Sequence, residues 1–136
     1  MHLPLKGDGS QRALLWQSQC VADIIGNSGY SWKVKAVVPD ELFCYIRQYR
    51  CDIGLFYGRN VGGFISGIGE DEDAMHQQMC QEKPDMEVVT EIAKRNGLVF
   101  LCFNREEKEL PDDMTPYGYH YYMETGDYII YIRGEE

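Results

Sequence analysis

The residues with the clearest catalytic potential lie in the segment NREEKE, residues 104–109, and in the tyrosine-rich segment that follows it. Glu106 and Lys108 have the E-x-K spacing of metal-dependent nucleases, in which a carboxylate holds Mg²⁺ and a lysine helps to activate water. His120 is a candidate general base, because an imidazole changes its charge near neutral pH. Together these three residues define a candidate site for a metal-dependent hydrolase or a small-molecule (nucleotide) binding protein.

The surroundings of these residues lack the other parts of a catalytic site. The second metal-binding carboxylate would come from Asp85, which follows Pro84, or from Asp52. Asp85 is expected to open a helix, whereas nuclease sites place that carboxylate on a strand. No G-x-S-x-G segment and no cysteine-protease signature accompanies His120. E-x-K is also common in exposed charged loops. The balance favours a protein without catalytic residues, metal or cofactor.

The charged residues are unevenly distributed along the chain. Residues 1–69 carry seven Lys/Arg and five Asp/Glu, whereas residues 70–136 carry six and seventeen, which together give the net charge of −9. Such a surface repels a phosphate backbone, so direct binding to nucleic acid is not expected. The densest acidic run, Glu70, Asp71, Glu72 and Asp73, lacks the ligand spacing of an EF-hand loop. We expect it to steer a protein partner that has a basic surface.

Two further sequence features bear on binding and on compartment. The glycines of residues 58–69 resemble turn glycines more than a phosphate loop, because no G-x-x-x-x-G-K-[ST] segment is present. The five cysteines include no C-x-x-C pair, and we see neither a signal-peptide core nor a membrane span. The expectation is a cytoplasmic protein with reduced thiols and no membrane partner. Cys20, Cys44 and Cys102 are expected to be buried, because they lie within apolar patterns. For Cys51 and Cys80 the sequence does not decide between burial and exposure.

Six of the ten tyrosines lie between residues 117 and 131. The ETGD segment is typical of a hairpin turn, and both faces of the resulting hairpin are apolar or aromatic. One face must meet the core, and the other is either covered by a helix or left as an aromatic patch. The residues that we expect to contact a partner are Tyr117, Tyr119, Tyr122 and Tyr131.

Periodicity and turn residues predict the elements that position these side chains. Helices are expected at about 11–25, with Ser10 as N-cap, at 40–49 and at 85–97. Strands are expected at 32–38, 52–57, 63–68, 98–103, 117–123 and 127–133. Residues 70–84 are interpreted as a polar connection with room for one loose helical turn. The sequence therefore predicts one α+β domain over residues 1–136. Its mostly antiparallel sheet would have five to six strands, with two to three helices on one face.

The expected function follows from the charge and the aromatic residues. We expect a small acidic binding protein that acts through protein–protein interaction. Immunity proteins and phage-encoded inhibitors of host defence use the same physical means, so an inhibitor is one form of this expectation. The edge of the last strand also predicts pairing with a second copy, which would give a homodimer.

Overall fold

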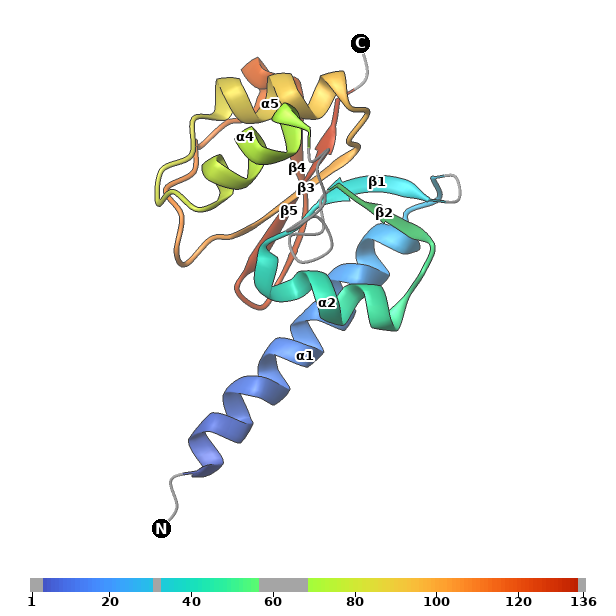
Figure 1. The fold of residues 1–136 in the computed structure, drawn as a ribbon, viewed down its shortest axis with the longest axis vertical. Coiled ribbons are helices and arrows are strands. Elements are labelled where there is room, and N and C mark those ends of the chain that lie inside the picture. Colours follow the sequence, from blue (N-terminus) through green and yellow to red (C-terminus); the bar gives the residue numbers. More distant parts are fainter. Residues whose placement is uncertain (1–3, 31–32, 57–68, 135–136) are drawn as a thin grey trace.

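The computed structural model describes residues 4–30, 33–56 and 69–134, with side chains from residue 12 onward. Figure 1 shows the ribbon coloured along the sequence. The elements, in chain order, are α1 (Pro4–Gly26), β1 (Val34–Val37), α2 (Asp40–Tyr49), β2 (Ile53–Leu55), α4 (Glu70–Met79), α5 (Met86–Arg95), β3 (Phe100–Asn104), the 3₁₀ turn η1 (Thr115–Tyr117), β4 (Tyr119–Thr125) and β5 (Tyr128–Arg133). The α+β class is confirmed.

The described strands form one mixed sheet in the order β2-β1-β3-β5-β4. β1 pairs in parallel with both β2 and β3, whereas β5 runs antiparallel to β3 and β4. The prediction of a mostly antiparallel sheet is therefore wrong for the first half of the chain. Each parallel pair is joined through helices, and a helical crossover returns the chain to the same end of the sheet before the next strand begins. The predicted strand at 63–68 lies outside the described residues.

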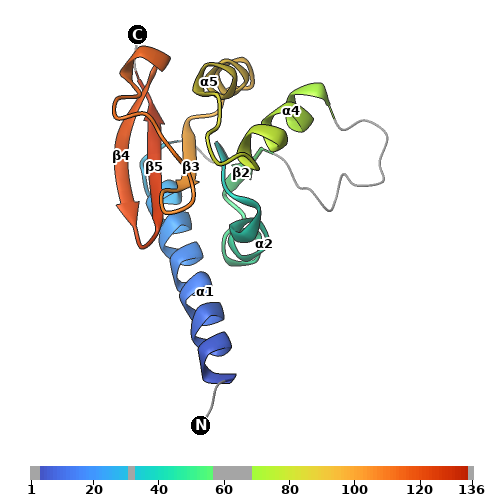
Figure 2. The ribbon, with the colours of Figure 1, turned by 90° about the vertical axis from the view of Figure 1, so that its left-hand side faces the viewer.

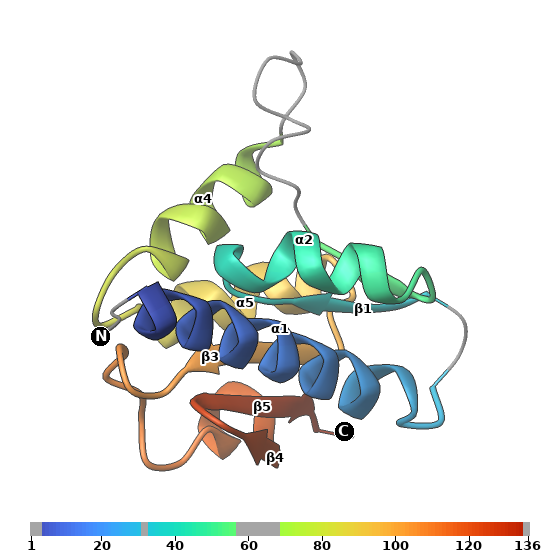
Figure 3. The same ribbon diagram turned by 90° about the horizontal axis from the view of Figure 1, so that it is seen from below.

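Helices cover both faces of the sheet, and not one face as predicted. α1 and α2 pack with Ala36, Phe100 and Ile130 in one apolar cluster. α4 and α5 pack on the opposite face, where Leu101 and Tyr131 belong to a second cluster. Figure 2 shows α4 and α5 together at one end, and Figure 3 shows α1 beside α2. All five residues of β3 are buried, which confirms the prediction of a central strand from its apolar run.

α1 is longer than its apolar pattern indicates. It begins at Pro4, so Ser10 lies inside the helix and the predicted N-cap is wrong. Its later turns pack under the sheet, where the side chain of Gln17 accepts a hydrogen bond from the backbone N–H of Asp127 at 2.7 Å. Its first turns extend beyond the sheet (Figure 1), and Trp16 is 57% exposed. The apolar stripe predicted only the part of α1 that packs against the sheet, because the turns that extend beyond the sheet have no apolar surface to cover.

The segment predicted as a polar connection contains α4. Its two methionines, Met75 and Met79, are buried in the second cluster. They lie four residues apart and so share a helix face, but the polar residues between them hide this pattern. α5 forms as predicted, because the carboxylate of Asp85 accepts hydrogen bonds from the N–H groups of Glu87 and Val88 in the first turn. In the described part of the chain, no helix combines the length and apolarity needed to cross a membrane.

The predicted hairpin is confirmed, with a register change inside it. Tyr121 pairs with Tyr131 and Met123 pairs with Ile130, so Tyr122 is the extra residue of a β-bulge. The bulge moves Met123 to the opposite face from Tyr121, whereas simple alternation predicts one shared face. Both faces of the hairpin meet a core cluster, because the sheet has helices on each side.

Candidate binding cleft

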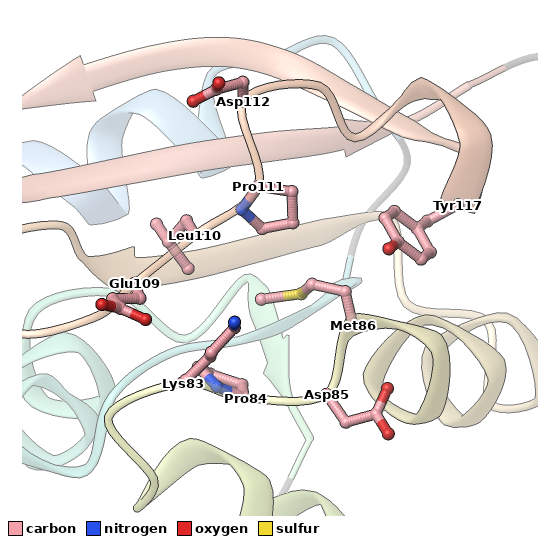
Figure 4. Close-up of a pocket in the computed structure, with 9 residues that line it drawn as sticks. All are labelled: Lys83, Pro84, Asp85, Met86, Glu109, Leu110, Pro111, Asp112 and Tyr117. Atoms are coloured by element: carbon pink, nitrogen blue, oxygen red, sulfur yellow. The ribbon is translucent and has the colours of Figure 1, made fainter.

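An open cleft lies between the segment that enters α5 and the loop that follows β3. It has a volume of about 730 Å³. One wall consists of residues 83–86 and the other of residues 109–112, with Tyr117 of η1 at one end (Figure 4). Because both walls are loops without a shared strand ladder, side-chain and backbone contacts must hold them in place.

The two walls are tied together at one end by main-chain and lysine contacts. The backbone N–H of Glu109 donates to the carbonyl of Glu82 at 2.8 Å. Lys108 donates through Nζ to the carbonyl of Met79 at 2.6 Å and to that of Gln81 at 2.7 Å. These carbonyls belong to the end of α4, where backbone acceptors have no partner within the helix. Lys108 therefore fixes the β3 loop to α4 and sets the separation of the walls.

The floor of the cleft is the outer surface of the second core cluster. Met86 is 3% exposed and belongs to that cluster, and Leu110 and Tyr117 pack against it half-buried. Figure 4 shows the Met86 side chain directed between the two walls. Pro84 and Pro111 give each wall a residue with a fixed φ, which limits how far the walls can move. The floor offers an apolar surface that needs no rearrangement to receive a side chain.

The rim of the cleft is acidic. Asp85, Glu109 and Asp112 contribute carboxylates, and Lys83 is the cation among the residues that line it. Nearby, the backbone N–H of Thr115 donates to Asp113 and lowers the pKa of that carboxyl. All of these acids come from the half of the chain that carries the net negative charge. The cleft is thus an apolar trough with a negative rim.

The predicted acidic contact residues form the first turn of α4 and do not line the cleft. Asp71 accepts from Arg95 at 2.8 Å and from Asn96 at 2.8 Å. These hydrogen bonds lower the pKa of Asp71 to about 2, and the guanidinium of Arg95 contributes more than the amide of Asn96. Its carboxylate is therefore committed to joining α4 to the end of α5. Glu72 is half-buried, whereas Glu70 and Asp73 are exposed. The turn lies roughly 14 Å along the helix axis from the end of α4 beside the cleft.

The predicted tyrosine contacts divide between the cleft and the core. Tyr117 lines the cleft. Tyr119 is fully buried and donates its hydroxyl to the carbonyl of Leu98 at 2.6 Å, and burial raises its pKa to about 12. Tyr131 is also buried, with 5% exposure. Tyr119 and Tyr131 are therefore core residues and not surface contacts, because the face that they share lies under α5.

The remaining predicted contact, Tyr122, is half-buried. Its ring centroid lies 5.3 Å from that of Phe100, with the two rings tilted by 58°. It packs against the first core cluster. The exposed ring of the hairpin is instead Tyr121, with 56% of its surface accessible.

The predicted catalytic set is not brought together. His120 pairs with Ile132, which in turn pairs with Phe100 at the start of β3. Glu106 follows the opposite end of β3, so His120 lies at the other end of the sheet. Lys108 binds backbone carbonyls, as described above. In the described ranges, no group of three or more His, Cys, Asp or Glu side chains is placed to hold a metal ion.

Comparison with protein-family models, curated proteins and solved structures found no match for this chain. The cleft is therefore interpreted from its own geometry. Sequence reasoning identified Tyr117 but missed Met86, Leu110 and the carboxylates of Glu109 and Asp112. The available signal was the pair of segments KPDM and ELPDD, each with a proline beside charged and apolar residues. Nothing in the sequence indicates that they face each other.

Proposed function

We propose that this protein binds a protein partner by taking a basic, partly apolar segment of that partner into the cleft. The observation that supports the proposal is an apolar floor formed by Met86, Leu110 and Tyr117 in a cleft that Glu109 and Asp112 also line. A lysine or arginine side chain suits such a site, because its methylene stem covers the apolar floor while its charge reaches the rim. An inhibitor that covers a basic surface of its target is one form of this function.

Charge complementarity favours this occupant over an acidic one. Three carboxylates and one ammonium group line the cleft, and the surrounding half of the chain has a net charge of −11. Electrostatic attraction of this kind mainly raises the association rate and the selectivity for basic partners. The desolvated contacts at the floor would supply most of the affinity. Nucleic acid is a poor occupant, because its phosphates would face the carboxylate rim.

A peptide titration of the full chain tests the proposal. The probes are two fluorescent decapeptides, one that alternates Lys with Leu and one that alternates Glu with Leu. We expect saturable binding of the Lys peptide alone, with an affinity that falls as salt rises from 50 to 200 mM. Amide NMR shifts should concentrate at Met86, Leu110 and Tyr117. Equal binding of both peptides would overturn the proposal.

Two double charge reversals separate the cleft from the acidic turn of α4. Glu109→Lys with Asp112→Lys and Glu70→Lys with Asp73→Lys change the net charge equally, and all four side chains are exposed. The cleft variant should reduce affinity at least about tenfold, whereas the α4 variant should reduce only the association rate. If the α4 variant loses the affinity and the cleft variant keeps it, the acidic run predicted from sequence is the contact. Equal losses would show that only net charge matters.

A further inference from the structure

The thiol of Cys80 lies beside an imidazole at the end of α4. Its Sγ is 3.8 Å from Nε2 and 4.0 Å from Nδ1 of His76, one helical turn earlier. Cys80 is exposed, so a reagent in solution can reach the sulfur. A thiol reacts as its thiolate, and an adjacent imidazole is a natural acceptor for its proton.

The imidazole is held in place from a different element. Nε2 of His76 lies 2.8 Å from Oδ2 of Asp40, the first residue of α2. With Asp40 accepting from Nε2–H, Nδ1 is the ring nitrogen that can take a proton from the thiol. A carboxylate also stabilises the imidazolium that this transfer produces. Thiol, imidazole and carboxylate thus form a connected set of three residues from two helices.

Cys80 and Asp40 of this set line a crevice of about 260 Å³, which shares no lining residue with the binding cleft. Its lining comes from residues just after β1, the end of α4, and the end of β3 with its following loop: Pro39, Asp40, Glu41, Met79, Cys80, Phe103, Asn104, Glu107 and Lys108. β1 leads into α2 on one face of the sheet, whereas β3 is reached through α4 and α5 on the other. Crevices outside the carboxyl ends of parallel strands, where the connections diverge in this way, are the usual ligand sites of such sheets.

A cation also lies next to Cys80. The ammonium group of Lys108 binds the carbonyls of Met79 and Gln81, the residues on either side of the cysteine. It offsets the partial negative charge at the end of α4, which would otherwise oppose a thiolate. Carboxylates of Glu41 and Glu107 line the same crevice, and Glu41 is engaged by the hydroxyl of Tyr128 at 2.9 Å.

We propose that Cys80 is a site of thiol–disulfide exchange with low-molecular-weight disulfides, with His76 as the base that accepts its proton and the crevice as the seat of the incoming disulfide. The sulfur of Cys80 attacks one sulfur of the disulfide, and a mixed disulfide on Cys80 forms as the original S–S bond breaks. The second half of the disulfide leaves as a thiolate, which takes the proton from the imidazolium. Cys80 is oxidised and the small disulfide is reduced, so no further oxidant is needed.

The chain contains its own comparison thiols. Cys44 and Cys51 are also exposed, and neither shows a hydrogen bond to an imidazole within the described residues. Cys102 is buried, and burial raises the pKa of its thiol, so it serves as an unreactive reference. All three exposed thiols are open to solvent, so a large difference in rate among them reports their chemical surroundings.

The test treats the folded full chain with oxidised glutathione, quenches with acid at intervals, and measures the mixed disulfide at each cysteine by peptide mass spectrometry. Cys80 should react at least about tenfold faster than Cys44 and Cys51. His76→Ala should reduce the Cys80 rate to theirs without changing the other two. Equal rates for the three exposed thiols in the unaltered protein would overturn the proposal, and this comparison needs no variant that must fold. A Cys80 rate that survives His76→Ala would overturn it as well.

Discussion

Replacing Tyr119 with phenylalanine tests the assignment of this ring to the core. Its hydroxyl donates to the carbonyl of Leu98 at 2.6 Å, and the side chain is fully buried. The substitution keeps the ring and removes only the hydroxyl. It therefore leaves the carbonyl of Leu98 without this donor inside the protein.

The expected loss can be estimated from the hydrogen bond alone. Leaving a buried acceptor without its partner costs about 1–3 kcal/mol. For a chain of this length, that corresponds to a fall in Tm of roughly 4–12 °C. The slope of the urea denaturation curve should not change, because the surface exposed on unfolding is the same.

The difference in unfolding free energy between the unaltered protein and Tyr119→Phe should also depend on pH. Burial raises the pKa of Tyr119 to about 12, from a usual value of 10.0. The folded state thus keeps the phenol neutral, so its contribution is complete below pH 10 and is lost as the pH rises towards 12. At about pH 11 the loss is roughly 1 kcal/mol. Tyr119→Phe has no phenol at this position and so does not lose this stability at high pH. The difference in unfolding free energy between the two proteins should therefore narrow by that amount.

Urea unfolding followed by tryptophan fluorescence at about pH 8 and about pH 11 measures both effects. Tyr121→Phe is the matched control, because Tyr121 lies two residues along the same strand and is 56% exposed. It should change stability by less than about 0.5 kcal/mol at either pH. Equal effects of the two substitutions, or a gap for Tyr119 that does not narrow with pH, would refute the core assignment.

Three further substitutions test an ion pair between helices, a buried core side chain and a turn conformation. Asp71→Asn should lower Tm at about pH 6 and much less at pH 2, because the low pKa that Arg95 and Asn96 impose on Asp71 stabilises the fold above pH 4 and this contribution is lost as the pH falls through about 2. Met75→Ala should cost about 2–5 kcal/mol in chemical denaturation, since this side chain is fully buried under α4. Gly126→Ala should cost about 1 kcal/mol or more in the same assay, because the residue has a φ of 56° in the β4–β5 turn.

Local patterns in the sequence determined several elements without the help of the fold. The N-cap of Asp85, the apolar face after it and the closing Asn96–Gly97 predicted α5, because capping and periodicity act within a few residues. The unbroken apolar run 98–103 predicted a strand buried on both faces, and β3 is that strand. The ETGD turn predicted the hairpin of β4 and β5, because the residues of a short turn decide by themselves whether the two flanking strands pair as a hairpin.

Pairing over long sequence distances was decided only by the tertiary structure. The sequence contains no signal that β1 lies between β2 and β3, because parallel neighbours are joined through helices and share no turn. The same strand order places helices on both faces of the sheet, because α2 connects strands on one face and α4 and α5 connect strands on the other. α4 was missed for a related reason. Its helix is stabilised by burying Met75 and Met79 against a surface that residues far along the chain build.

The two candidate sites show the same division. The sequence by itself determined the acidic character of the second half and the presence of Tyr117, Cys80 and His76. The tertiary structure placed the wall at 83–86 opposite the wall at 109–112, and it set Asp40 2.8 Å from His76 across 36 residues. The physical reason is that composition and short-range spacing act through local conformation and net charge. A cleft or a three-residue cluster exists only after distant segments are packed together, and that packing follows from how the whole core is buried.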